Sequence, residues 1–167
     1  MKTSIHFLKS KPYVSVLIIL LLLTGFSACN DDDEPEMAPK VNYTGSFVKS
    51  TETVTTSATG TTTATYDPNT MELSYTITWT GLGSNAANMH LHDDGPVIVP
   101  VTGFPTATSG TVSGKATLTA QQAMDLAANK IYAQIHTATY PGGEVIARLS
   151  KSTSGSNPPP GGNGGGY

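Results

Sequence analysis

Residues Met71–Thr80 read Met-Glu-Leu-Ser-Tyr-Thr-Ile-Thr-Trp-Thr, and their pattern indicates the fold class. Apolar side chains occupy every second position from Met71 to Trp79, and glutamate, serine and threonine occupy the positions between them. This strict alternation predicts a β-strand with one buried face and one solvated face. Residues 67–70, Asp-Pro-Asn-Thr, predict a turn just before it, so residues 58–66 are expected to form the other arm of a hairpin.

The period of two continues on both sides of this hairpin. Short segments rich in threonine and apolar residues are separated by turns rich in glycine and proline. Threonine has a high β propensity and keeps the solvated faces of sheets soluble. About eight short strands with frequent turns predict an all-β protein, an antiparallel sandwich or barrel. The strands expected outside the hairpin are Tyr43–Lys49, Ala87–His92, Val97–Val101, Thr111–Leu118, Lys130–His136 and Glu144–Leu149.

One short helix is expected to interrupt the strands. Thr119 is followed three residues later by Gln122, which is the pattern of a capping box at a helix N-terminus. The apolar residues that follow have helical spacing, and Asn129 and Lys130 suit the end of the helix. We expect this helix to close one end of the sandwich.

Residues 1–28 have the features of a bacterial lipoprotein signal peptide. Three lysines precede an apolar run, Val14–Leu23, that is shorter than the roughly 20 residues a membrane-spanning helix needs. A retained membrane span is therefore the weaker interpretation. Residues 26–29, Phe-Ser-Ala-Cys, resemble a lipobox, although phenylalanine replaces the usual leucine.

Cys29 is the only cysteine in the chain, so no internal disulfide can form. Acylation of Cys29 with chains such as palmitate would explain the presence of a single cysteine and would hold the protein on a membrane. The alternative is an ordinary signal peptide followed by a stray thiol. Lipidation at Cys29 is the prediction we carry forward.

The segments on either side of the expected domain have the composition of linkers. Residues 29–40 include the acidic run Asp31–Glu36, which is typical of a solvated tether. This run also resembles the export tag of some lipoproteins on the outer face of the outer membrane, which indicates a cell-surface location. Residues 151–167 are rich in glycine, proline and serine, and we expect them to be disordered.

The length and charge limit the functions to consider. Residues 41–150 suit a single domain, which excludes a two-domain enzyme. Loss of the three lysines of the leader would change the formal net charge from −3 to −6. With this charge and no basic patch, nucleic acid is not an expected partner.

The sequence contains the motifs Tyr66-Asp67-Pro68, Leu73-Ser74-Tyr75, His90-Leu91-His92, and His136-Thr137 followed by Tyr140-Pro141-Gly142-Gly143-Glu144. Together these motifs resemble the CHRD domain, first described in the extracellular inhibitor chordin and common in secreted microbial proteins. The resemblance extends from about residue 47 to residue 149. It implies an immunoglobulin-like β-sandwich or barrel and no agreed enzymatic activity.

The sequence departs from the family pattern at two places. A Glu-Val-Pro-Pro-like stretch is usual near the start of the family, but residues 52–55 read Glu-Thr-Val-Thr. The family usually has Ile-Arg-Gly after the Gly-Glu, whereas this chain has Val-Ile-Ala at 145–147, so Ile146 occupies the arginine position. We therefore do not expect this chain to have any role that depends on that arginine in other members of the family.

Three histidines are the candidate metal ligands. His90 and His92 are two residues apart on one expected strand, so they share a face with their Cα atoms about 6.6 Å apart. His136, at the end of another strand, is a candidate third ligand, and Asp93 and Asp94 could add oxygen atoms. Three imidazoles suit Zn²⁺ or Cu²⁺. The alternative is that the histidines bind loop carbonyls and hold strand ends together.

Two functions remain open at this stage. The first is a lipid-anchored, non-enzymatic surface module that binds a protein or glycan partner. The second is an envelope metalloprotein that binds one Zn or Cu ion through His90, His92 and His136. A hydrolase is disfavoured because the sequence has no Gly-x-Ser-x-Gly motif, and no certain cofactor is expected.

Overall fold

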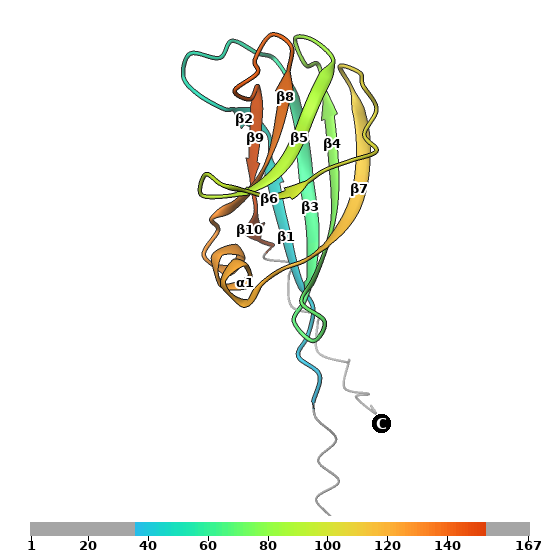
Figure 1. The fold of residues 1–167 in the computed structure, drawn as a ribbon, viewed down its shortest axis with the longest axis vertical. Helices are drawn as coiled ribbons and strands as arrows, with labels where there is room; N and C mark the ends of the chain where they lie inside the picture. The colour runs from blue at the N-terminus through green and yellow to red at the C-terminus, as the bar shows by residue number, and fades with distance from the viewer. Residues whose placement is uncertain (1–35, 153–167) are drawn as a thin grey trace, which may run out of the picture. The chain divides into compact units, whose positions relative to one another are not determined.

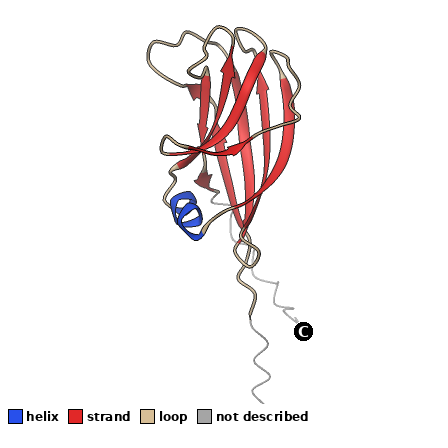
Figure 2. Cartoon of the chain, viewed as in Figure 1, coloured by secondary structure: helices blue, strands red, loops and turns tan. Residues whose placement is uncertain are grey.

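The protein is a β-sandwich of two five-stranded antiparallel sheets with one short helix (Figures 1 and 2). This computed structural model describes residues 36–152. The predicted signal peptide, Cys29, most of the acidic tether and most of the predicted disordered tail lie outside these residues. The prediction of disorder was wrong at Lys151, which pairs with Tyr43 as part of a strand. The elements are β1 Val41–Ser46, β2 Val48–Lys49, β3 Thr59–Asp67, β4 Glu72–Thr80, β5 Ala86–Asp93, β6 Val97–Pro100, β7 Gly110–Thr117, α1 Ala120–Ala127, β8 Ile131–Thr137, β9 Val145–Arg148 and β10 Ser150–Lys151.

The strand order defines two open sheets. Sheet A has the order β10-β1-β3-β4-β7, and sheet B has the order β2-β9-β8-β5-β6. Every strand pair is antiparallel. The sequence-based prediction of an all-β, immunoglobulin-like antiparallel fold with one short helix is confirmed, in its sandwich form, because neither sheet closes into a barrel.

The β3–β4 hairpin forms as the alternating pattern predicts, apart from its first residue. Leu73, Ile77 and Trp79 have almost no exposed surface, and the residues between the buried positions face outward. The prediction was wrong at Met71, which has a φ of 57° and belongs to the turn. A left-handed residue is needed there to close the turn that begins at Asp67, so the strand starts at Glu72.

The described residues form ten strands and not about eight, because the chain changes sheets near both ends of the domain and thereby adds the short strands β2 and β10. The expected strand Tyr43–Lys49 is divided at the buried Phe47 into β1 of sheet A and β2 of sheet B. Near the other end, the fully buried Leu149 separates β9 of sheet B from β10 of sheet A. Gly45 of β1 allows β1 and β9 to lie close together at this point, because a Cβ atom at residue 45 would lie against the backbone carbonyl of Arg148.

The helix forms as predicted and lies at one end of the sandwich (Figure 1). Both halves of the capping box are present: the Gln122 amide donates to the Thr119 hydroxyl, and the Thr119 amide donates to the Gln122 side chain. Leu118 and Leu126 anchor the segment in the core. The helix connects β7 of sheet A to β8 of sheet B and helps to cover the core at this end.

Thr62 is a polar residue in the apolar interior. Its side chain is fully buried on β3, and its hydroxyl oxygen has no hydrogen-bond partner among the described residues. A buried hydroxyl without a partner costs about 1–3 kcal/mol of stability. We expect Thr62→Val, which has nearly the same shape, to raise the free energy of unfolding by about 1 kcal/mol in urea denaturation.

The control for this prediction is Thr63→Val on the exposed face of the same strand, expected to change the free energy of unfolding by less than about 0.5 kcal/mol. A clear loss of stability in Thr62→Val would show that its hydroxyl has a partner.

Candidate metal centre

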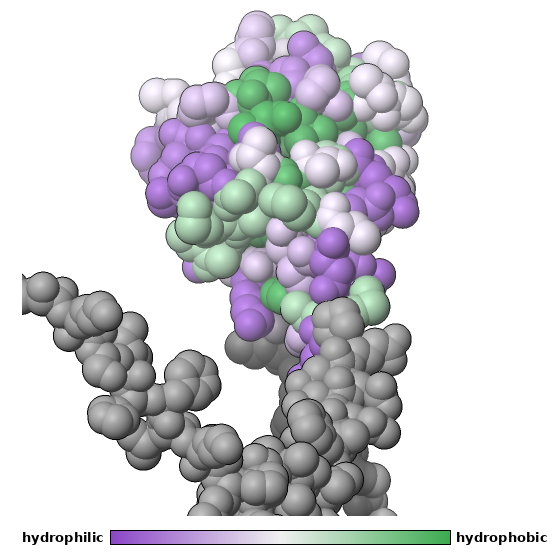
Figure 3. All heavy atoms as spheres, turned by 60° about the horizontal axis from the view of Figure 1, so that its bottom comes forward, coloured by the Kyte–Doolittle hydropathy of each residue, from purple (hydrophilic) through white to green (hydrophobic). Residues whose placement is uncertain are grey.

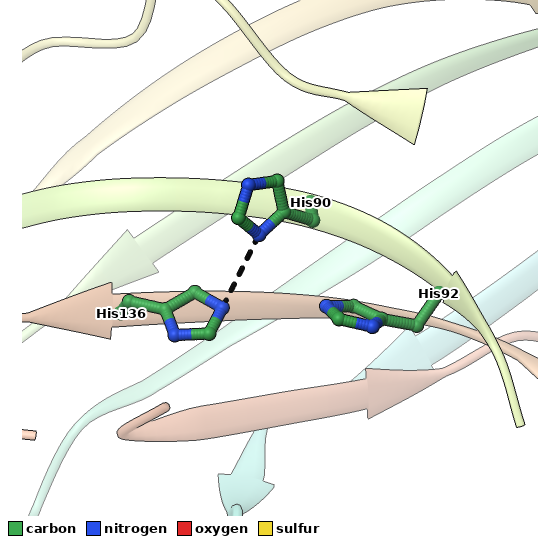
Figure 4. A group of neighbouring side chains, drawn as sticks. All are labelled: His90, His92 and His136. Atoms are coloured by element: carbon green, nitrogen blue, oxygen red, sulfur yellow. Dashed lines mark hydrogen bonds between the residues drawn. The ribbon is translucent and has the colours of Figure 1, made fainter. Parts of the chain in front are cut away.

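The three candidate histidines meet on the outer face of sheet B. Met89 and Leu91 of β5 point into the core, so His90 and His92 point outward. The antiparallel register of β5 and β8 pairs Asn88 with His136, which brings the third imidazole to the same surface. One nitrogen from each ring lies within 4.8 Å of the other two (Figure 4). The structure therefore brings together all three residues that the sequence analysis selected, while metal binding itself stays a prediction.

Backbone carbonyls orient two of the three rings. His92 Nδ1 lies 2.7 Å from the carbonyl oxygen of Gly95, and His136 Nδ1 lies 2.8 Å from that of Pro141. A carbonyl only accepts hydrogen bonds, so each Nδ1 carries the proton and each Nε2 keeps its lone pair. Metal-binding histidines commonly have this arrangement, in which the second nitrogen donates to a carbonyl and fixes the ring.

His92 has a buried nitrogen with no partner. Its side chain is 7% exposed, and Nε2 has no hydrogen bond among the described residues. In Figure 4 the His92 ring extends toward His136. An unpaired polar atom in a buried position normally costs stability. A metal ion bound at Nε2 would remove this cost.

The spacing of the other two rings suits a tetrahedral ion. His90 Nδ1 lies 3.3 Å from His136 Nε2. Two nitrogens bound at about 2.0–2.1 Å to one tetrahedral Zn²⁺ lie about 3.3–3.4 Å apart. The same 3.3 Å separation is also compatible with a hydrogen bond in which His90 donates to His136. The alternative of purely structural histidines therefore has a geometric basis too, and experiment must separate the two.

A stack of side chains holds His92 in position. The ring of Tyr132 lies parallel to that of His92, with 5.0 Å between centroids and 4° between planes. On β8 and β9, Arg148 is paired with Tyr132, and its guanidinium lies 5.1 Å from the Tyr132 ring. Arg148 also donates to the backbone carbonyls of Asn129 and Lys130. The sequence analysis missed both Tyr132 and Arg148 as supports of the site, because the stack forms across three strands.

The neighbouring acids do not join the histidines. Asp94 forms an ion pair with Arg148, at 3.2 Å, and the Asp93 side chain interacts with Asp125. Burial, followed by the nearby Asp125 charge, raises the pKa of Asp93 above its ordinary value. The suggestion that Asp93 and Asp94 could supply oxygen ligands is therefore wrong for this arrangement.

The His90 imidazole favours its neutral form. Burial lowers the pKa of His90 below its ordinary value of 6.5, and possible positive charges on His136 and His92 lower it further. Neutral imidazole is the form that binds a metal ion. The packing of the site therefore assists metal binding at neutral pH.

A surface hollow of about 400 Å³ adjoins the cluster. His90 and His136 line it, whereas His92 is not part of its wall. The buried His92 thus lies on the protein side of the cluster, and the other two imidazoles meet the open side. The remaining wall residues are Ala87, Asn88, Thr137, Ala138 and Pro141.

A model of the CHRD domain family matches residues 40–148 of the chain. The chain belongs to the CHRD domain family. The matched residues contain all three histidines and agree with the extent of the resemblance noted in the sequence. Comparisons with curated proteins and with solved structures gave no match.

The CHRD domain of this protein places Ile146 beside Gln134 on the outer face of sheet B, where the family usually has arginine. Arg148 lies two residues further along β9 and points to the same side, over Tyr132. Position 146 therefore adds an apolar side chain to the surface near the histidines.

Among the described residues, no helix has both the length and the apolar character that crossing a membrane requires.

Glu144, the last residue of the Tyr-Pro-Gly-Gly-Glu motif, supports the end of β8, which carries His136. Its side chain is completely buried and accepts hydrogen bonds from the Thr56 hydroxyl at 2.6 Å, the Gly83 amide at 2.9 Å and the Thr137 hydroxyl at 2.9 Å. The Thr137 hydroxyl also accepts a hydrogen bond from the Tyr140 amide. The Tyr-Pro-Gly-Gly-Glu motif was the available sequence signal for the supporting role of Glu144. The hydrogen-bond partners of Glu144 could not be found from the sequence, because they are far apart in the chain.

We expect Glu144→Gln to lower the free energy of unfolding by about 1.5–3 kcal/mol. The amide nitrogen of glutamine would replace one acceptor oxygen and would face a donor. Urea denaturation measures the loss, and Glu52→Gln is a matched control because Glu52 is exposed and pairs only with Lys49. If both variants unfold at the same urea concentration, Glu144 does not organise the loops.

Proposed function

We propose that this protein is a lipid-anchored envelope module whose CHRD domain binds one Cu²⁺ or Zn²⁺ ion through His90, His92 and His136. The observation that carries the proposal is the buried, unpartnered Nε2 of His92, directed at two other imidazoles within 4.8 Å. The carbonyls of Gly95 and Pro141 leave the Nε2 lone pairs of His92 and His136 free for a metal. His90 completes the set through Nδ1, which faces His136 Nε2.

The proposed role is binding and not catalysis. The chain has no Gly-x-Ser-x-Gly motif, and its single cysteine lies in the proposed anchor. Three nitrogen ligands suit both Zn²⁺ and Cu²⁺, with Cu²⁺ bound more tightly by the usual order of affinities. Storage of the ion or stabilisation of the domain in the envelope would follow from such a site.

Metal binding is tested by elemental mass spectrometry of the full chain after exposure to Cu²⁺ or Zn²⁺ and dialysis. We expect about one equivalent to be retained, and His92→Ala to retain almost none, because three protein ligands define the site. Asn42→Ala on the outer face of sheet A is the control and should retain metal as the wild type does.

Thermal unfolding separates this proposal from histidines with a structural role alone. A ligand that binds only the folded state raises the melting temperature, so a chelator should lower that of the metal-loaded wild type. A chelator without effect, together with a lower melting temperature for His92→Ala, would mean that the histidines only hold the strands together.

We propose further that acylation of Cys29 anchors the mature protein in the outer membrane, at the cell surface, with residues 29–40 as a tether. The basis is the sequence of residues 1–36. Cys29→Ser should abolish labelling by a palmitate analogue and move the protein out of the membrane fraction. Unchanged labelling and fractionation would reject the anchor, and protease treatment of intact cells would test surface exposure.

A protein or glycan partner is the second proposal, and the outer face of sheet A favours a glycan. A hollow of about 800 Å³ on this sheet is lined largely by hydroxyl and amide side chains, including Asn42, Thr63, Thr65 and Ser113. In contrast, the most exposed large hydrophobic residues, Met37, Val48, Val97 and Met124, lie on separate segments. Figure 3 shows apolar and polar side chains intermixed on the end of the domain that it brings forward.

The glycan proposal predicts binding to envelope or host polysaccharides, measured by surface plasmon resonance on the purified full chain. Thr63→Arg should weaken binding by filling the hollow. Thr117→Arg, outside the hollow on β7, should bind as the wild type does. Equal binding by the two variants would exclude this surface.

A further inference from the structure

The geometry of the histidine cluster leaves one side of a bound ion accessible to solvent. His92 is buried, whereas His90 and His136 are partly exposed and line the 400 Å³ hollow. An ion held by the three imidazoles would therefore have protein on the His92 side and the hollow on the other. Sites with three protein ligands and a free position bind water or an exogenous ligand there, unlike closed structural sites with four protein ligands.

The charge balance of the site favours an anion at that position. A divalent ion bound by three neutral imidazoles keeps its full charge of about +2. The charge of Asp94 is balanced by its ion pair with Arg148, at 3.2 Å. The group of potential ligands found among the described residues contains the three histidines and no carboxylate.

The walls of the hollow supply one amide beside the imidazoles and several apolar groups. Ala87 and Ala138 present only methyl groups, and Pro141 adds an apolar ring. Asn88, which is paired with His136 across the strands, adds an amide that can donate a hydrogen bond. These residues suit an anion that binds the ion with one atom and receives a hydrogen bond from the amide at another.

We propose that the metal centre is an open site that exchanges an anion through the hollow between His90, His136 and Ala138. This inference rests on the proposed metal binding and specifies the ligand class of the same site. No redox step is part of it. With an ion held by the three imidazoles, an anion entering through the hollow would replace a bound water molecule and donate an electron pair to the ion.

The test uses the copper-loaded full chain and azide as the probe anion. We expect azide to produce a saturable azide-to-copper charge-transfer band and to change the electron paramagnetic resonance spectrum. Ala138→Leu, which places a larger side chain at the wall, should weaken azide binding about tenfold or more while copper content stays at one equivalent. Ala127→Leu, an exposed position on α1, is the matched control and should bind azide as the wild type does.

The outcomes are distinct for the two proposals. Copper bound at one equivalent without any spectral response to azide would overturn the open site and leave metal binding intact. An equal azide affinity in Ala138→Leu and Ala127→Leu would overturn the entry route through the hollow. Failure to retain copper in the wild type would reject the metal centre and the open site together.

Discussion

The hydrogen bonds to the buried side chain of Glu144 are the interactions on which the segments beside the histidine cluster depend. Three segments that are far apart in the chain donate to this side chain: Thr56 between β2 and β3, Gly83 between β4 and β5, and Thr137 at the end of β8. A buried carboxylate is tolerated only when donors surround it. Once they do, the positions of all three segments are linked to one residue.

The hydrogen bonds of Glu144 also help to fix the position of His136 in the histidine cluster. Thr137 follows His136 directly, and its hydroxyl is held between Glu144 and the Tyr140 amide. The segment between β8 and β9 then returns to sheet B, where the Pro141 carbonyl accepts a hydrogen bond from His136 Nδ1. A hydrogen bond from Gln134 to the Gly142 carbonyl fastens the same segment to the strand. Glycine suits position 143 because its φ of 112° is one that other residues rarely adopt, and a Cβ atom there would also displace the Gln134 side chain.

The two outer faces of the sandwich have different chemistry. Sheet A presents cross-strand hydroxyl pairs, such as Thr76 with Ser113 and Thr78 with Thr111, on a surface without a concentrated charge. Sheet B carries the imidazoles, which loops and the Tyr132–Arg148 stack partly cover. One domain thus offers a hydroxyl-rich surface suited to a glycan and a nitrogen-rich surface suited to a metal ion, on opposite sheets.

Local patterns in the sequence predicted most of the strands, their buried faces, the start of α1 and the three histidines of the cluster. These features depend on periodicity, capping and motifs, so they can be read from neighbouring residues. Three-dimensional packing was needed to reveal the crossings between sheets at Phe47 and Leu149 and the ion pair of Asp94 with Arg148. The same packing buries His92 against Tyr132 and forms the hollow beside His90. Strand register and loop packing join residues that are distant in the chain, and local patterns carry no information about those pairings.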